Sequence, residues 1–303
     1  MDRRQAARLM VNTLASTLAG TRLAPAFALP PGPAGPAARG NVRFSVMLWT
    51  LEHPEPKGSF DHALEVVAAA GYQGVELVGE FQKWAPEEQR RLLARMRALG
   101  LEVDAMSGVA TGFAAPDPSG LFLTQFTAHL QAAQELGCPQ VILLSGNRAG
   151  TPDAQRLRAI ENLKRAADLA ARHHIEIVME PIDLLENPEI FLASVTPAFE
   201  LARAVNHPSL KVLYDLFHEQ RSFGNLTEEL ERNLDLVGLI HVADVPGRHE
   251  PGTGEIDFAS LYRTLAELHY NRWIAMEFYP TADPASTLRR AREDAAAILQ
   301  AKT

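Results

Sequence analysis

The chain has 303 residues, of which 47% are hydrophobic and 22% are charged, and it contains 20 glycines and 20 prolines. This composition is typical of a globular protein and excludes a disordered, collagen-like or coiled-coil chain. The net charge of −8, together with the lack of a basic run interleaved with aromatic residues, argues against nucleic-acid binding. Cys138 is the single cysteine, which excludes an internal disulfide and a cysteine-based zinc cluster.

The first 41 residues have the character of a leader and a linker. Arg3 and Arg4 precede a mildly apolar stretch, and a small-x-small cleavage pattern ends at Ala28. This order predicts a signal peptide over residues 1–28, and the paired arginines indicate the twin-arginine route to the periplasm or the outside of the cell. A proline- and glycine-rich linker is predicted over residues 29–41. The alternative is an extension that stays attached to a cytoplasmic protein.

From residue 42 onwards, a short apolar strand pattern followed by a helix pattern recurs eight times. The strands are predicted at Arg43–Leu48, Gly74–Leu77, Leu101–Met106, Gln140–Leu144, Ile175–Glu180, Leu210–Asp215, Gly238–Val242 and Trp273–Phe278. The helices that follow them are predicted at Phe60–Ala70, Pro86–Leu99, Ser119–Leu136, Pro152–His174, Pro188–Val205, Thr227–Leu234, Phe258–Leu268 and Pro284–Gln300.

This alternation predicts the fold class. The central strands are nearly continuous apolar runs, which indicates that both of their faces are covered. The first strand is not followed by the glycine-rich phosphate turn that an open nucleotide-binding sheet would carry. We therefore predict an α/β protein with a single (β/α)8 TIM barrel over residues 42–303. No run of about 18 apolar residues occurs, so no membrane span is expected.

Acidic and histidine residues occur where the last four strands end, at the face on which such barrels build their active sites. Glu180 ends the fifth strand, Asp215 ends the sixth, and His241 and Glu277 lie in the seventh and eighth. Neighbouring buried carboxylates repel one another unless a cation lies between them. Three oxygens and one imidazole suit one divalent ion, Mn²⁺, Mg²⁺ or Co²⁺, with Zn²⁺ as an alternative. Taken singly, each carboxylate could instead cap a helix or form a salt bridge, and His241 could be a core histidine.

Several segments resemble the sugar isomerase and epimerase barrels of the xylose isomerase-like family. They are GVE at residue 74, EPID at 180, YDLFH at 214, IHVAD at 240, EPGTGEID at 250 and MEF at 276. The resemblance covers roughly residues 42–300, and EPGTGEID is its most specific segment. Within the family, the chain resembles hydroxypyruvate isomerases most, and ketose 3-epimerases come next. The resemblance implies a metal-dependent isomerase that acts through an enediolate, typified by conversion of hydroxypyruvate to tartronate semialdehyde.

The resemblance also implies roles for individual residues. The implied metal ligands are Glu180, Asp215, His241 and Glu277. Two of these ligands, Glu180 and Glu277, would also act as the catalytic acid/base pair. The implied contacts to a small-molecule substrate, a hydroxy-keto acid or a ketose, are Glu186, His218 and Arg248. An arginine can hold a substrate carboxylate in a bidentate manner, although Arg248 could also be a solvated loop residue.

Three positions depart from the hydroxypyruvate isomerase pattern. His241 stands where those enzymes can carry glutamine, Glu186 matches the epimerases, and Asp183 replaces the usual asparagine. Isomerase and ketose 3-epimerase therefore both stay open. A non-enzymatic alternative is a barrel that binds a sugar acid without turning it over, but binding alone needs no pair of bases. Members of the family often self-associate, so a homo-oligomer is compatible with the resemblance.

Overall fold

The computed structural model describes residues 42–52 and 59–301, so the predicted signal peptide and linker lie outside the described residues. Eight parallel strands close into a barrel in chain order, and β8 pairs with β1. The strands are β1 (Arg43–Met47), β2 (Gly74–Val78), β3 (Glu102–Ser107), β4 (Gln140–Leu144), β5 (Glu176–Glu180), β6 (Leu210–Asp215), β7 (Val237–Val242) and β8 (Trp273–Met276). The prediction of a single TIM barrel is confirmed.

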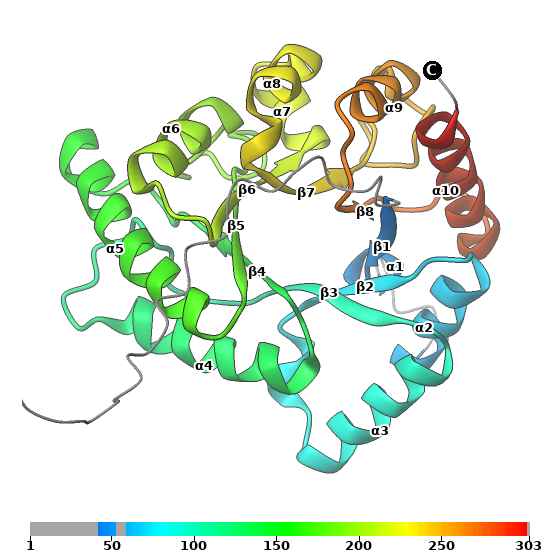
Figure 1. The fold of residues 1–303 in the computed structure, drawn as a ribbon, viewed down its shortest axis with the longest axis horizontal. Helices are drawn as coiled ribbons and strands as arrows, with labels where there is room; N and C mark the ends of the chain where they lie inside the picture. Colours follow the sequence, from blue (N-terminus) through cyan, green and yellow to red (C-terminus); the bar gives the residue numbers. More distant parts are fainter. Residues whose placement is uncertain (1–41, 53–58, 302–303) are drawn as a thin grey trace, which may run out of the picture. The chain divides into compact units, whose positions relative to one another are not determined.

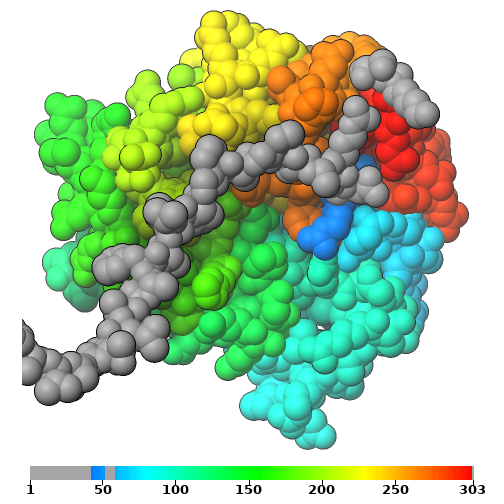
Figure 2. Space-filling model, in the orientation of Figure 1, coloured from blue at the N-terminus to red at the C-terminus, as the bar shows by residue number. Residues whose placement is uncertain are grey.

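The helices surround the strands, and Figure 1 looks into the barrel with this outer layer around it. The α-helices are α1 (Trp49–Glu52), α2 (Phe60–Ala69), α3 (Pro86–Ala98), α4 (Leu121–Leu136), α5 (Pro152–Arg172), α6 (Val195–Val205), α7 (Leu216–Ser222), α8 (Leu226–Asn233), α9 (Phe258–Glu267) and α10 (Pro284–Gln300). Two 3-10 turns are η1 (Glu80–Lys83) and η2 (Leu234–Leu236). The space-filling view shows the outer layer following the chain around the ring, from α3 in cyan to α10 in red (Figure 2). None of the described helices is long and apolar enough to cross a membrane.

Two apolar cores hold the barrel together. The larger one lies between the strands and the outer helices. The smaller one fills the inside of the barrel, and its members are Met47, Ala105, Ile142, Val178, Leu213, Leu239, Trp273 and Ala275. Polar groups among these inner residues are therefore costly unless they have partners or a function.

The helix predicted at Pro188–Val205 begins later than expected, at Val195. Ser194 is the N-cap and accepts a hydrogen bond from the backbone of Thr196. The preceding residues are held by the β4–α5 loop instead, because Ile190 pairs with Asn147 in an antiparallel bridge. Proline at the start of a helical pattern was therefore a misleading start signal here.

A short helix, α7, follows β6 without a connecting loop and was not among the predicted helices. Helix α7 starts immediately at Leu216, and the carboxylate of Asp215 accepts hydrogen bonds from the backbone amides of Phe217 and His218. His218 thus lies in a short helix that is capped by a predicted metal ligand. This capping fixes the direction in which Asp215 leaves the strand.

Candidate metal centre and active site

The structure brings the four predicted metal ligands together at the carboxyl ends of adjacent strands. Glu180 and Asp215 end β5 and β6, His241 lies in β7, and Glu277 follows β8 directly. Each of the four offers one ligand atom, and these atoms lie within 4.8 Å of one another. All four side chains are buried. The strand register explains this closeness, because Asp215 is paired with His241 across the β6–β7 ladder.

Glu277 lies close to two positively charged groups. Its Oε2 atom lies 2.8 Å from His241 Nδ1 and 2.9 Å from Arg248 Nη2. Its Oε1 atom accepts a hydrogen bond of 3.2 Å from the Trp49 indole. Burial alone would raise the pKa of Glu277, but the charges of Arg248 and His241 outweigh it and hold that pKa well below its usual range. Glu277 is therefore an ionised carboxylate.

Glu180 is in the opposite electrostatic situation. Its Oε1 atom lies 3.8 Å from His241 Nδ1. Burial and the nearby charge of Glu277 raise the pKa of Glu180 to about 8. Two carboxyl groups in one site with pKa values pushed apart are the usual arrangement of an acid and a base.

The donor set fits a hard divalent cation. Three carboxylates and one imidazole nitrogen converge on one point from four strands, and the site is largely closed to solvent. Such oxygen-rich sets with a single imidazole suit Mn²⁺, Mg²⁺ or Co²⁺ and also allow Zn²⁺. A cation at this point would neutralise the repulsion between the carboxylates of Glu180, Asp215 and Glu277.

The three predicted substrate contacts lie beside this centre. Arg248 is buried, and its Nη1 atom lies 3.0 Å from Oε2 of the half-exposed Glu186. His218 is buried as well, with Nδ1 2.6 Å from Asp183 Oδ2 and Nε2 3.6 Å from Asp215 Oδ2. Although burial opposes protonation, the charge of Asp215 and the hydrogen bond to Asp183 raise the pKa of His218 to about 9.

Asp183, Glu186 and His218 also lie close enough to one another to resemble a second metal site. Two arginines already supply positive charge there, because Arg221 Nη2 lies 3.3 Å from Asp183 Oδ1 and Arg248 pairs with Glu186. A second cation at this position would be repelled by both guanidinium groups. The cluster therefore suits an anionic substrate group better than a metal ion.

The loop that carries Arg248 is folded around one buried carboxylate. Oδ1 of Asp244 accepts hydrogen bonds from the amides of Val245 and Ile256, and Oδ2 accepts them from the amides of Gly252 and Gly254. These four bonds are 2.8–3.1 Å long. They account for much of the EPGTGEID segment, which wraps around the side chain of Asp244.

Steric constraints explain why both of these positions in the segment are glycine. Gly252 has a φ of +90°, which side chains rarely adopt. A Cβ atom on Gly254 would lie 1.9 Å from the carbonyl oxygen of Val245, so no side chain fits there. Arg248 itself has a left-handed φ of 56°, and its amide donates to the carbonyl of Asp244.

Glu76 and Asp244 belong to the site or its support, yet they were not among the predicted site residues. Glu76 lies inside the barrel, and its Oε2 atom is 3.0 Å from His241 Nε2. A charged residue within the apolar β2 pattern was the available signal for Glu76. Nothing in the sequence indicated that Asp244 accepts hydrogen bonds from four backbone amides, because those contacts depend on loop geometry.

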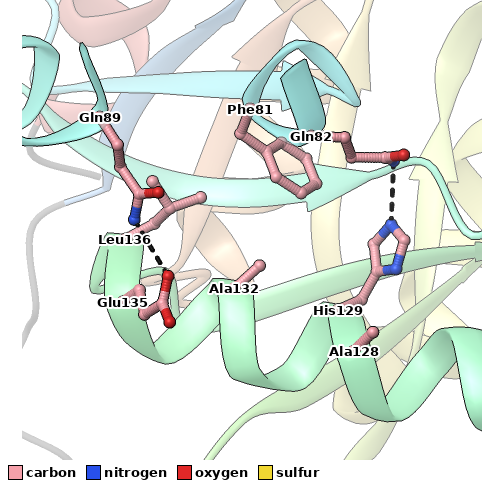
Figure 3. Close-up of a pocket in the computed structure, with 8 residues that line it drawn as sticks. All are labelled: Phe81, Gln82, Gln89, Ala128, His129, Ala132, Glu135 and Leu136. Atoms are coloured by element: carbon pink, nitrogen blue, oxygen red, sulfur yellow. Dashed lines mark hydrogen bonds between the residues drawn. The ribbon is translucent and has the colours of Figure 1, made fainter. Parts of the chain in front are cut away.

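A separate cavity lies outside the barrel, between η1, α3 and α4 (Figure 3). Gln82 contacts His129 across it, and Gln89 donates a hydrogen bond to Glu135. Phe81 packs edge-on against the His129 ring. The polar groups here are satisfied by each other, and the cavity contains none of the predicted site residues.

The chain is similar to known proteins over most of its length. The sequence profile of the xylose isomerase-like TIM barrel family matches residues 64–300. A 2-oxo-tetronate isomerase from Pectobacterium atrosepticum is 31% identical over 226 residues, which cover 71% of this chain and 85% of that protein. The hydroxypyruvate isomerase of Escherichia coli is 29% identical over 257 residues, which cover 82% and 97%. A crystal structure described as an AP endonuclease of family 2 from Brucella melitensis superposes with a TM-score of 0.73 at 25% identity, covering 82% of this chain and 96% of that one.

Proposed function

Because the chain belongs to the xylose isomerase-like TIM barrel family, we propose that it is a metal-dependent isomerase of a small hydroxy-carbonyl compound. The observation that carries the proposal is the convergence of three carboxylates and one imidazole at the barrel mouth, with Arg248 bound to one of them. The isomerase names of its relatives at about 30% identity support the same reaction class. Intact Glu180 and Glu277 favour turnover over mere binding of a sugar acid.

The proposed metal ligands are Glu180, Asp215, His241 and Glu277. A divalent ion held by them would act as a Lewis acid on the substrate carbonyl, which makes the proton on the neighbouring carbon easier to remove. All further steps fall to side chains of the protein.

Glu277 is the proposed base, because the guanidinium group of Arg248, 2.9 Å from its Oε2 atom, keeps its carboxylate ionised. It would remove the proton from the carbon next to the carbonyl and so give an enediolate. Glu180, the second carboxyl group of the site, would deliver a proton. Delivery to the neighbouring carbon, with the hydroxyl proton moving from one enediolate oxygen to the other, isomerises the substrate, whereas delivery to the original carbon from the opposite face inverts it. The indole of Trp49 donates to Glu277 and would orient this base toward the substrate.

We propose an α-keto acid of the hydroxypyruvate type as the substrate, because the buried guanidinium group of Arg248 can bind its carboxylate in place of the exposed Glu186. The buried His218, which is hydrogen-bonded to Asp183, would hold a second substrate oxygen. A ketose 3-epimerase is the second candidate, favoured by His241 and by the position of Glu186, whose carboxylate reaches the mouth of the site. A DNA-repair nuclease is disfavoured by the net charge of −8.

Solvent exchange tests the proposal directly. The purified protein is incubated in D₂O with hydroxypyruvate, with 2-oxo-tetronate and with free ketoses, and deuterium incorporation is located by NMR. We expect exchange and product with the keto acids, loss of both after EDTA treatment, and recovery with Mn²⁺. Full activity of the metal-free protein would remove the metal from the mechanism, and exchange only at C3 of a ketose would favour the epimerase.

A further inference from the structure

Glu76 is the clearest unexplained charge inside the barrel. It lies on β2 and is completely buried. Neither of its carboxylate oxygens accepts a well-formed hydrogen bond from the described residues. The position two residues earlier, Gly74, faces the indole of Trp273, which would lie 2.8 Å from a Cβ atom placed there. The layer of the barrel below Glu76 is therefore filled by the Trp273 ring.

A carboxylate in such surroundings lowers stability unless it has a cationic or hydrogen-bonding partner. The partner that the structure offers is His241, whose Nε2 atom lies 3.0 Å from Glu76 Oε2. The N–H direction is off the line of an ideal hydrogen bond, so the contact is an ion pair at hydrogen-bonding distance. The other ring nitrogen, Nδ1, faces Glu180, Asp215 and Glu277 at 2.8–3.9 Å.

The two ring nitrogens of His241 therefore have different surroundings. A metal ion bound by the four-residue set requires an unprotonated nitrogen on the side of the ring that points to the three carboxylates. That nitrogen is Nδ1. The remaining proton must then be on Nε2, in a completely buried position inside the barrel. A buried N–H group without an acceptor costs free energy, and Glu76 is the carboxylate that lies within reach of it.

We propose that Glu76 is a positioning residue of the metal centre, which fixes the His241 tautomer and ring orientation by accepting the Nε2 proton. The inference rests on the proposed metal-dependent function, and it adds a residue that contacts no substrate. Carboxylate partners of metal-bound histidines also raise the basicity of the imidazole, and their loss typically weakens metal binding about 10–100-fold.

The neighbouring carboxyl group of Asp104 provides a matched control. Asp104 is also completely buried, and its Oδ2 atom accepts a hydrogen bond of 2.6 Å from the Ser45 hydroxyl. An asparagine at this position can still accept that bond. Glu76→Gln and Asp104→Asn thus make the same chemical change inside the same barrel, but only Glu76 contacts a proposed metal ligand at ion-pair distance.

Metal affinity is the decisive measurement. Isothermal titration of Mn²⁺ into the metal-free full chain should show a Kd raised about tenfold in Glu76→Gln and up to about 100-fold in Glu76→Leu. The Asp104→Asn variant should stay within about twofold of the unsubstituted protein. Because Glu76→Gln removes one partner of a buried ion pair, its melting temperature in EDTA should fall, so the Kd values are compared at a temperature at which every variant is folded.

Imidazole ¹⁵N NMR of the Zn²⁺-loaded protein adds a readout that does not depend on turnover. It should show the His241 proton on Nε2. Equal Mn²⁺ affinity in both Glu76 variants and the unsubstituted protein would overturn the inference, as would a protonated Nδ1 in the loaded protein. If the unsubstituted protein bound no divalent ion at all, the proposed function itself would fail first, which separates the two outcomes.

Discussion

Replacing Asp244 with alanine should unfold the loop that carries Arg248 before it affects the rest of the barrel. The substitution removes the acceptor of four backbone amides. Two of the donors, the amides of Val245 and Ile256, belong to buried residues, and each would cost about 1–3 kcal/mol when left without a partner. The other two belong to exposed glycines and can bond to water instead. The expected loss of unfolding free energy is therefore about 2–6 kcal/mol.

Asparagine at the same position gives a graded comparison. Its single oxygen can serve the buried amides of Val245 and Ile256, while its NH₂ group faces the exposed glycine amides. The expected loss is then about 1–2 kcal/mol, which reflects weaker, uncharged bonds to the buried pair. Urea unfolding followed by far-UV circular dichroism in EDTA measures both values without a contribution from bound metal.

The same variants should change substrate binding, because Arg248 lies on this loop. The KM for a keto acid should rise in Asp244→Ala more than kcat falls, while Mn²⁺ affinity should change little. If Asp244→Ala lost less than about 1 kcal/mol, the four bonds would not be the main support of the loop, and the reasoning from amide satisfaction would be refuted.

Three further predictions concern other parts of the chain. Glu277→Gln should keep the fold and lower kcat by about 10²–10⁴, and near-normal turnover would assign the base elsewhere. Burial raises the pKa of Glu219 from 4.5 to about 7, so its contribution to stability is complete below pH 4.5 and is lost as the pH rises through 7. Glu219→Gln should therefore remove up to about 3 kcal/mol of pH dependence in the unfolding free energy between pH 4.5 and 8, and an unchanged pH profile would contradict this. We also propose export with cleavage after Ala28, which the mass of the secreted protein would reveal; an intact Met1 on exported protein would contradict it.

The sequence predicted the barrel and the placement of the four central residues, because both depend on regular patterns. Parallel strands that end in Glu180 and Asp215 bring their last side chains to one face of the barrel, whatever the details of the loops. The helix boundary at Val195 was missed because the segment before it pairs with another loop, a contact far away in the sequence. The support from Glu76 and Asp244 was missed for the same reason. Their partners are set by barrel closure and loop folding, which local periodicity does not contain.

Arg248 bears on both candidate reactions, because the two carboxylates closest to its guanidinium group differ in burial. Glu277 is buried at 2.9 Å from Nη2, whereas the Glu186 side chain at 3.0 Å from Nη1 is 44% exposed. A substrate carboxylate that competes for Arg248 would therefore displace Glu186, since water can solvate the released side chain and exposed pairs contribute only about 0–1 kcal/mol. A neutral ketose offers no such carboxylate and would leave Glu186 in place to accept a hydrogen bond from a sugar hydroxyl. Glu186→Gln should thus lower the KM for a keto acid or leave it unchanged, and it should raise the KM for a ketose. Opposite effects on the two substrates make this one residue a discriminator between isomerase and epimerase.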